Sequence, residues 1–174
     1  MKYKKALVTG GAGFIGSHLV EALLKNNVTV LVVDNLLTGK KTNLDRLENV
    51  DIIYDDIGSN ESIKEIEKFK PEICFHLAAQ SSVVISVEDP LLDFEHNLLQ
   101  PIKLIQTLIS TDCKKFVFSS SGGTIFGEPN IIPTSEEDFA GEPVSPYGVA
   151  KKKLNDFIKL MLENEKMSYS ILNL

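Results

Sequence analysis

Tyr147 and Lys151 lie four residues apart in a segment that begins Ser145-Pro146-Tyr147. Serine favours the N-cap of a helix, proline favours its first position, and residues at i and i+4 share a helix face. A phenol is a poor base at neutral pH because its reference pKa is about 10, but a nearby ammonium favours the phenolate and lowers that pKa. The pair therefore predicts a proton-transferring tyrosine. A solvated, lysine-rich helix face is the alternative.

A glycine-rich turn lies near the N-terminus. Gly10, Gly13 and Gly16 satisfy the pattern G-x-x-G-x-x-G, and Gly11 with the last two satisfies G-x-G-x-x-G. Glycines permit a tight turn and a close approach to a pyrophosphate, and a helix opening at Phe14 would present unpaired N–H groups to it. A tight turn without a ligand is the alternative. A strand pattern before the turn and a helix pattern after it favour dinucleotide binding.

An acidic residue follows at the end of the next strand pattern. Asp34 lies 18 residues after Gly16. A carboxylate there accepts hydrogen bonds from a ribose 2′-hydroxyl and repels a 2′-phosphate, which predicts NAD rather than NADP. The alternative is an aspartate that only starts a turn. Lys40 and Lys41 are the nearest positive charges and argue weakly for NADP.

Serines occupy the end of a later strand pattern, where the chain reads Ser119-Ser120-Ser121 before two glycines. Open α/β sheets bind ligands at the carboxyl ends of their strands, so a hydroxyl there is placed to bond a substrate oxygen. A turn-forming serine cluster is the alternative for any single one of them.

These residues need a scaffold, and the hydrophobic pattern predicts one. Short β-branched runs alternate with helical spacing, which indicates a Rossmann-type, doubly wound parallel sheet of about six strands with helices on both faces. The expected strands are Ala6–Thr9, Val28–Asp34, Val50–Tyr54, Ile73–Leu77, Phe116–Ser119 and Tyr169–Leu174.

The helices between these strands are less regular. One apolar face should contain Phe14, Leu19, Leu23 and Leu24, and another should contain Leu154, Phe157, Ile158 and Met161.

Two long segments stand out from this alternation. Leu91 to Thr111 has the pattern of one long helix, in which Pro101 should end or kink the helix near Gln100. The segment from Ser121 to Ser145 has no periodicity, and a loop of that length in a compact domain is usually functional.

Length and composition exclude several classes of protein. The 174 residues, 43% of them hydrophobic and 24% charged, suit one globular domain, which we expect to span 1–174. No apolar run is long enough to cross a membrane or to form a secretory signal. The two cysteines have no metal or redox spacing, so we expect no metal and a cytoplasmic protein. A net charge of −6 without a basic block argues against nucleic acid.

Taken together, the motifs resemble the extended short-chain dehydrogenase/reductase family, in the nucleotide-sugar epimerase branch typified by UDP-glucose 4-epimerase. The resemblance spans nearly the whole chain, in the order and spacing of the family. The matching stretches are TGGAGFIGSHL, VVDNLLTGKKTNL, DDI, HLAAQ, FVFSSSGGTIFGEP and SPYGVAK.

The resemblance implies residues that bind the cofactor, NAD. Phe14 and Ile15 would lie by the pyrophosphate, and Asp34 and Asn35 would hold the adenosine ribose. The adenine and the nicotinamide ribose would be contacted by residues after the third and fourth strands. These residues are Asp56 and Ile57 for the adenine, and Leu77, Ala78 and Ala79 for the channel near the nicotinamide ribose.

The resemblance also implies the catalytic residues: Tyr147 as acid and base, Lys151 as its partner, and Ser121 as the third hydroxyl. Tyr147 and Lys151 would also bind the cofactor, Lys151 at the nicotinamide ribose. The serine register differs from many relatives, because four residues rather than three separate it from Phe126-Gly127. Counting forward from the strand selects Ser121, with Ser120 in reserve.

Three further departures from the family pattern are visible. Phe126 replaces a usual tyrosine, and the usual N-V-x-G-T of the long helix reads Asn97-Leu98-Leu99-Gln100-Pro101. Members of the family usually exceed 300 residues, so we expect this chain to correspond to an N-terminal half with the substrate domain largely missing.

Three functions compete at this point. The resemblance favours an epimerase for a nucleotide sugar, most simply a UDP-hexose, that works through a transient 4-keto sugar. A sugar dehydratase or decarboxylase of the same family is the second, although Gly122 and Gly123 replace the acidic pair typical of dehydratases. A non-catalytic NAD-binding fragment is the third. Family dimers pair the long helix with the Tyr147 helix, so a homodimer is also expected.

Overall fold

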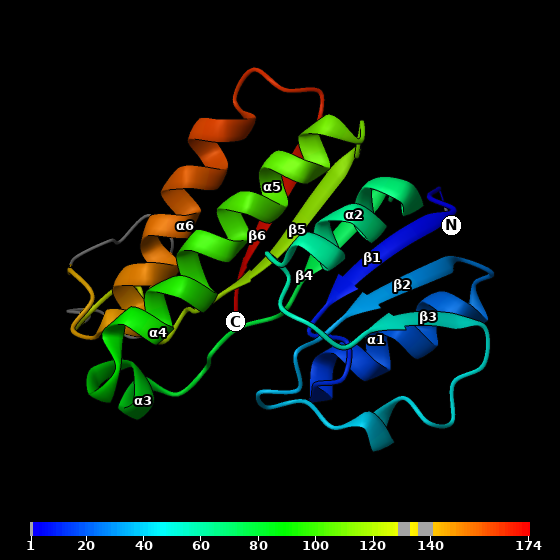
Figure 1. Ribbon diagram of the computed structural model, residues 1–174. Helices are drawn as coiled ribbons and strands as arrows, with labels where there is room; N and C mark the ends of the chain where they lie inside the picture. Colours follow the sequence, from blue (N-terminus) through cyan, green and yellow to red (C-terminus); the bar gives the residue numbers. More distant parts are fainter. Residues whose placement is uncertain (1, 129–132, 136–140) are drawn as a thin grey trace.

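The computed structural model describes residues 2–128, 133–135 and 141–174. Six parallel strands form one sheet in the order β3-β2-β1-β4-β5-β6 (Figure 1). This order reverses between β1 and β4, which is the Rossmann arrangement that the sequence predicts. The strands are β1 (Lys5–Thr9), β2 (Thr29–Val33), β3 (Val50–Ile53), β4 (Ile73–His76), β5 (Lys115–Ser120) and β6 (Ser168–Asn173).

The expected strands agree with the observed ones to within one residue at each end. The agreement has a physical reason, because β1 and β2 are buried on both faces apart from their first residues. A strand covered on both sides reads as a continuous β-branched run, which is the pattern the sequence shows.

Helices pack on the two faces of the sheet. One hydrophobic cluster joins the sheet to α2 (Asn60–Phe69), α5 (Gln100–Ser110) and α6 (Pro146–Leu162). A second cluster joins β1 and β2 to α1 (Phe14–Lys25) on the other face (Figure 1).

Two aromatic residues of the expected apolar faces are exposed, and the expectation of a buried stripe is wrong at Phe157. Phe14 is 80% exposed and Phe157 is 38% exposed. Phe14 is the first residue of α1 and lies before its packed turns, whose buried positions are Gly16, Ser17, Val20 and Leu23.

The long helical region is interrupted, as Pro101 predicts. After α3 (Val83–Glu88) and α4 (Pro90–Phe94), the chain makes a π-helical turn, η2 (Glu95–Leu99), before α5 begins at Gln100. Proline has no N–H to give to the carbonyl four residues earlier, and a π-helical turn is a usual way to absorb that loss. The interruption lies where the sequence places it.

The helix α6 begins as predicted. Ser145 is its N-cap, and the Ser145 hydroxyl accepts a hydrogen bond from the Gly148 N–H at 3.1 Å. The loop expected between Ser121 and Ser145 contains no helix or strand in its described parts, and residues 129–132 and 136–140 lie outside the described residues. A short 3₁₀ helix, η1 (Lys41–Asn43), follows β2.

Candidate functional site

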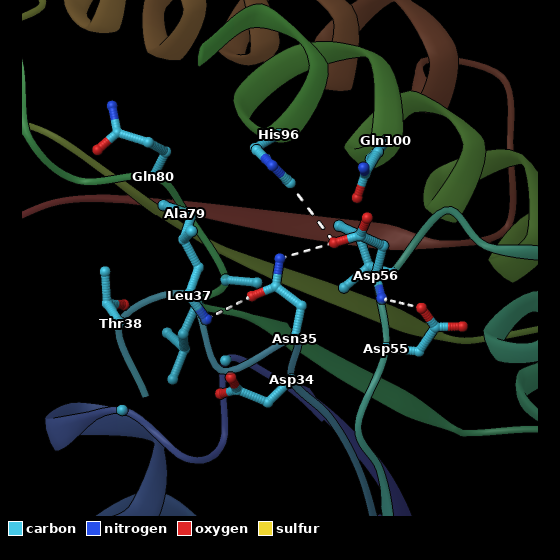
Figure 2. Close-up of a pocket in the computed structure, with 15 residues that line it drawn as sticks. Asp34, Asn35, Leu37, Thr38, Asp55, Asp56, Ala79, Gln80, His96 and Gln100 are labelled. Atoms are coloured by element: carbon cyan, nitrogen blue, oxygen red, sulfur yellow. Dashed lines mark hydrogen bonds and ion pairs between the residues drawn. The ribbon is translucent and has the colours of Figure 1, made fainter. Parts of the chain in front are cut away.

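A cleft opens at the carboxyl ends of β1, β2 and β4, where the strand order reverses. Its empty volume, part of it open to solvent, is about 540 Å³. Nine of the residues predicted to bind a dinucleotide line it, and Figure 2 shows it from close by. These residues are Gly10, Gly13, Asp34, Asn35, Asp56, Ile57, Leu77, Ala78 and Ala79.

The glycine-rich turn has no room for side chains at two of its positions. Gly10 has φ +71°, and a Cβ there would lie 2.6 Å from the Ala78 backbone nitrogen. A Cβ on Gly16 would lie 2.1 Å from the Gly10 carbonyl oxygen. The turn therefore brings its backbone against β4 and against the first turn of α1, whose N-cap residue Gly13 lines the cleft.

Asp34 fixes this turn from the end of β2. It is 5% exposed, and its Oδ2 accepts a hydrogen bond from the Ala12 N–H at 2.8 Å. Its Oδ1 accepts one from the Leu36 N–H, also at 2.8 Å. Each carboxylate oxygen can accept a further bond, so the group still has capacity for a ligand hydroxyl. Sequence reasoning missed this second role, because nothing in the local pattern pairs Asp34 with Ala12.

Across the cleft from the glycine turn, two loops and a helix bring polar side chains together. The Asn35 Nδ2 donates to the Asp56 Oδ1 at 2.6 Å, and the Asn35 Oδ1 accepts from the Leu37 N–H at 2.9 Å. The His96 Nδ1 lies 3.9 Å from the same Asp56 oxygen. Figure 2 shows His96 and Gln100 descending from the helical side toward Asp56.

A buried polar network includes Gln80, which lines the cleft, and no sequence motif indicates this network. The Asp93 Oδ1 accepts from the Gln80 Nε2 at 2.9 Å and from the Asn97 Nδ2 at 2.8 Å. The Gln80 N–H donates to the Asn97 Oδ1 at 3.1 Å, and the Asn97 Nδ2 also donates to the Gln80 carbonyl at 2.8 Å. These bonds tie the segment after β4 to α4 and η2. Burial raises the pKa of Asp93, opposed by its bonds to Gln80 and Asn97.

The tyrosine predicted to transfer protons is buried at the start of α6. Tyr147 is 9% exposed, and its side chain hydrogen-bonds to Ser121. Burial raises the pKa of Tyr147, the Ser121 bond opposes this effect, and the charge of Asp93 adds to it. The expectation that Lys151 lowers this pKa is wrong for the chain without a ligand, because loss of solvation outweighs any nearby positive charge.

Lys151 lies on the same helix but is turned toward β5. Its Nζ donates to the Ser119 carbonyl at 2.9 Å and lies 4.6 Å from the centre of the Phe118 ring. The same Nζ lies 5.8 Å from the centre of the Tyr147 ring. Burial lowers the pKa of Lys151 to about 8, against a smaller opposing effect of Asp93.

The two serine candidates differ in their contacts. Ser121 reaches Tyr147, whereas the Ser120 hydroxyl is buried and has no hydrogen-bond partner among the described residues. Ser121, Tyr147 and Lys151 therefore form a second group, separate from the residues that line the cleft. Phe14 and Ile15 are exposed at the start of α1, at 80% and 54%, and do not line the cleft either.

His76, at the end of β4, has no predicted role and is 1% exposed. Its Nδ1 is 2.7 Å from the Thr9 hydroxyl, and its ring stacks between Phe116 and Phe118. Burial, and the nearby charge of Lys151, lower the pKa of His76 to about 3, so it stays neutral and acts as a packed core residue.

Within the described part of the chain, no helix is long and apolar enough to span a bilayer.

The model of the NAD dependent epimerase/dehydratase family matches residues 6–174. The chain belongs to this family. A UDP-glucose 4-epimerase of Mycolicibacterium smegmatis is 41% identical over 150 residues, which cover 84% of this chain and 48% of the relative.

Solved structures of other family members give the same result. The UDP-glucose 4-epimerase of Thermotoga maritima, solved with UDP-glucose, matches with a TM-score of 0.91 and 40% identity. That of Thermus thermophilus, solved with NAD, matches with a TM-score of 0.89 and 39% identity. Each match covers 97% of this chain and 54% of the solved one. The chain spans about half the length of the curated relatives it matches.

Proposed function

We propose that this chain is the NAD-binding and proton-transferring part of a nucleotide-sugar 4-epimerase that acts on a UDP-hexose. The observation that carries the proposal is the cleft, because nine residues predicted from motifs far apart in the sequence line one cavity at the switch point of the sheet. The similar UDP-glucose 4-epimerases with NAD and with UDP-glucose support the choice of cofactor and substrate class.

The residues present fit a dinucleotide. At Gly10 and Gly16 the turn packs so closely against the chain's own backbone that only a hydrogen fits, as the tight turn and close helix–strand packing of a dinucleotide-binding motif require. Gly10 and Gly13 would hold the pyrophosphate, together with the open start of α1 at Phe14 and Ile15. Further along the cleft, Asp34 and Asn35 would hold the adenosine ribose, Asp56 and Ile57 the adenine, and Leu77 to Ala79 the nicotinamide ribose.

The chemistry would centre on Tyr147. As a phenolate it would take the proton of the sugar 4-hydroxyl, and as the resulting phenol it would return that proton when the other face of the keto sugar is reduced. Bound NAD supplies the acceptor and donor of the hydride. Ser121, which already hydrogen-bonds Tyr147, would orient the sugar oxygen, and Lys151 would contribute a donor held in place by the Ser119 carbonyl.

A dehydratase or decarboxylase is less well supported. Gly122 and Gly123 follow the catalytic serine in the sequence, and neither offers a carboxyl group for the elimination of water. A non-catalytic NAD-binding protein is the other alternative. Such a protein would need no proton-transferring tyrosine, whereas this chain has Tyr147 and Lys151 on one helix, with Ser121 beside Tyr147.

Two further proposals concern the assembly and location of the protein. Exposed apolar side chains lie on the helices that the resemblance implies in a homodimer, Leu91 and Leu99 on one and Phe157 and Leu160 on the other. We expect a dimer in sedimentation or mass measurements at micromolar concentration, whereas a monomer there would contradict the proposal. We also expect a cytoplasmic location, in line with two free cysteines at Cys74 and Cys113.

The proposal is tested by calorimetric titration of the purified chain with NAD, followed by incubation with UDP-glucose and NAD and separation of the sugars. We expect NAD to bind. We expect no turnover from these 174 residues alone, because the resemblance places most of the substrate-gripping residues after Leu174, and remote binding energy normally positions the reacting sugar. Failure to bind NAD would contradict the proposed function, and 4-epimer formation at enzyme-like rates would show that this part is sufficient.

A further inference from the structure

The cleft contains one buried polar side chain that no motif accounts for. Gln100, the first residue of α5, is only 6% exposed and lines the cleft. Its carboxamide makes no hydrogen bond to another described residue, and its oxygen and nitrogen are not among the buried polar atoms, so they are accessible from the cleft. A carboxamide that lines a cleft without a protein partner is available to hydrogen-bond a ligand group there.

Packing fixes the place of this side chain. A Cβ on Gly58 would lie 3.0 Å from the Gln100 Cγ and 3.2 Å from the Gln100 Cβ, so the stem of the glutamine rests on the turn just after Asp56 and Ile57. Figure 2 shows the carboxamide pointing from the helical side toward Asp56, with Asn35 on the opposite side.

The chemistry of the two side chains favours an amino group between them. An ionised Asp56 offers only acceptors, and one of its oxygens already accepts from Asn35. The Gln100 carboxamide offers an acceptor and a donor side by side, and glutamine pairs in this way with the amino group and a ring nitrogen of adenine. The 6-amino group of adenine has two hydrogens, so it can donate one to the Asp56 carboxylate and the other to the Gln100 carboxamide oxygen.

We propose that Gln100 is a further cofactor-recognition residue, whose carboxamide hydrogen-bonds the 6-amino group of adenine beside Asp56. This rests on the proposed function, which places the adenine at Asp56 and Ile57. The family pattern N-V-x-G-T has glycine at this position, where no side chain would be available for such a bond. The contact is therefore a property of this chain, and it strengthens the selection of an adenine dinucleotide.

The test compares NAD with nicotinamide hypoxanthine dinucleotide, in which a carbonyl oxygen replaces the 6-amino group. Calorimetric titration of the Gln100→Leu variant should show about tenfold weaker binding of NAD, as the loss of one hydrogen bond predicts. Binding of the hypoxanthine analogue should weaken less than binding of NAD, because its carbonyl oxygen cannot donate to the glutamine oxygen and the carboxamide would have to turn over to bond it. Gln106→Leu is the matched control, because Gln106 is exposed on the same helix and should leave both affinities unchanged.

Each result bears on a different claim. An unmodified chain that does not bind NAD contradicts the proposed function. A chain that binds NAD, but whose Gln100→Leu variant binds it equally well, overturns the role of Gln100 alone. If Gln100→Leu does not fold, Gln100→Glu decides, because it keeps an acceptor of similar reach. It should retain the preference for NAD over the hypoxanthine analogue, and a loss of that preference would overturn the proposal.

Discussion

The cofactor cleft and the Tyr147 group are built in opposite ways. Around the cleft, side chains hold the backbone. The Ala12 N–H donates to Asp34, and the Ala12 carbonyl accepts from the Asn43 side chain at 2.7 Å and from the Lys40 N–H at 3.0 Å. Around Tyr147, polar groups are buried without full satisfaction. Within the described residues, the Ser120 hydroxyl and the Asp93 Oδ2 have no hydrogen-bond partner.

The difference separates binding from chemistry. A preformed backbone site binds its ligand with little loss of conformational entropy, because its shape exists before the ligand arrives. The Tyr147 group instead contains buried ionisable side chains whose pKa values move away from their usual range, which is typical of a site that transfers protons. Changes in the two regions should therefore affect different measurements.

The largest expected effect separates turnover from binding. In a full-length version, Tyr147→Phe should lower the rate of epimerisation by about 10²–10⁴-fold, the usual contribution of a general acid and base. NAD affinity should stay within about threefold, because Tyr147 does not line the cleft. Steady-state kinetics measures the rate of epimerisation, and calorimetry measures the NAD affinity. Tyr169→Phe, on β6, is the control, and a Tyr147→Phe rate within threefold of the unmodified enzyme would exclude the acid–base role.

The same kinetics decide between the two serines. Ser121→Ala should reduce turnover and Ser120→Ala should not, because Ser121 is the one bonded to Tyr147. If Ser120→Ala is instead the damaging change, the register chosen for the catalytic hydroxyl is wrong.

The next largest effect falls on NAD binding and not on turnover. Gly16→Ala should weaken NAD binding by about 10–100-fold, because the new Cβ would lie 2.1 Å from the Gly10 carbonyl oxygen and overpacking typically costs about 1–3 kcal/mol. Gly123→Ala is the matched control, since a Cβ there meets nothing within 4 Å. Unchanged calorimetric affinity in Gly16→Ala would mean that the turn is not the phosphate cradle.

A smaller effect concerns stability and pH. Burial lowers the pKa of Lys151 to about 8, whereas the unfolded chain keeps a value near 10.5. Between these values the unfolded state binds more protons, so the stability of the chain should rise with pH. Lys151→Met should stabilise the fold at pH 7 by about 1–3 kcal/mol, and this gain should shrink as pH rises from 8 to 10.5.

Denaturant unfolding at a series of pH values measures this dependence. Lys153→Met provides the control, because Lys153 is exposed and its ion pair with Asp156 is weak at 3.6 Å. If the stabilisation by Lys151→Met does not depend on pH, the pKa of Lys151 is not lowered in the folded chain.

The sequence predicts the parts of this molecule that are set by local chemistry. The strands β1 and β2, the N-cap at Ser145 and the interruption before Pro101 follow from burial on both sheet faces, a hydroxyl cap and a missing N–H. The place of the glycine turn and Asp34 at the cleft follows as well, because parallel strands bring their carboxyl ends to one edge, whereas the other predicted lining residues follow from the family resemblance.

What the sequence does not predict depends on partners distant along the chain. Gln80, after β4, hydrogen-bonds Asp93 on α4, and no local sequence pattern specifies how α4 packs against that segment. The rise in the pKa of Tyr147 also escaped prediction, because it reflects burial, which the spacing of Tyr147 and Lys151 does not reveal.

We infer that the backbone of the glycine turn and the Asp34 carboxylate select NAD before any chemistry occurs. Calorimetric titration of the unmodified chain with NAD and with NADP tests it most directly. The account predicts that NAD binds at least about tenfold more tightly, because the buried Asp34 carboxylate would face a 2′-phosphate. It also predicts that Asp34→Ala reduces this preference. Equal or tighter binding of NADP to the unmodified chain would contradict it.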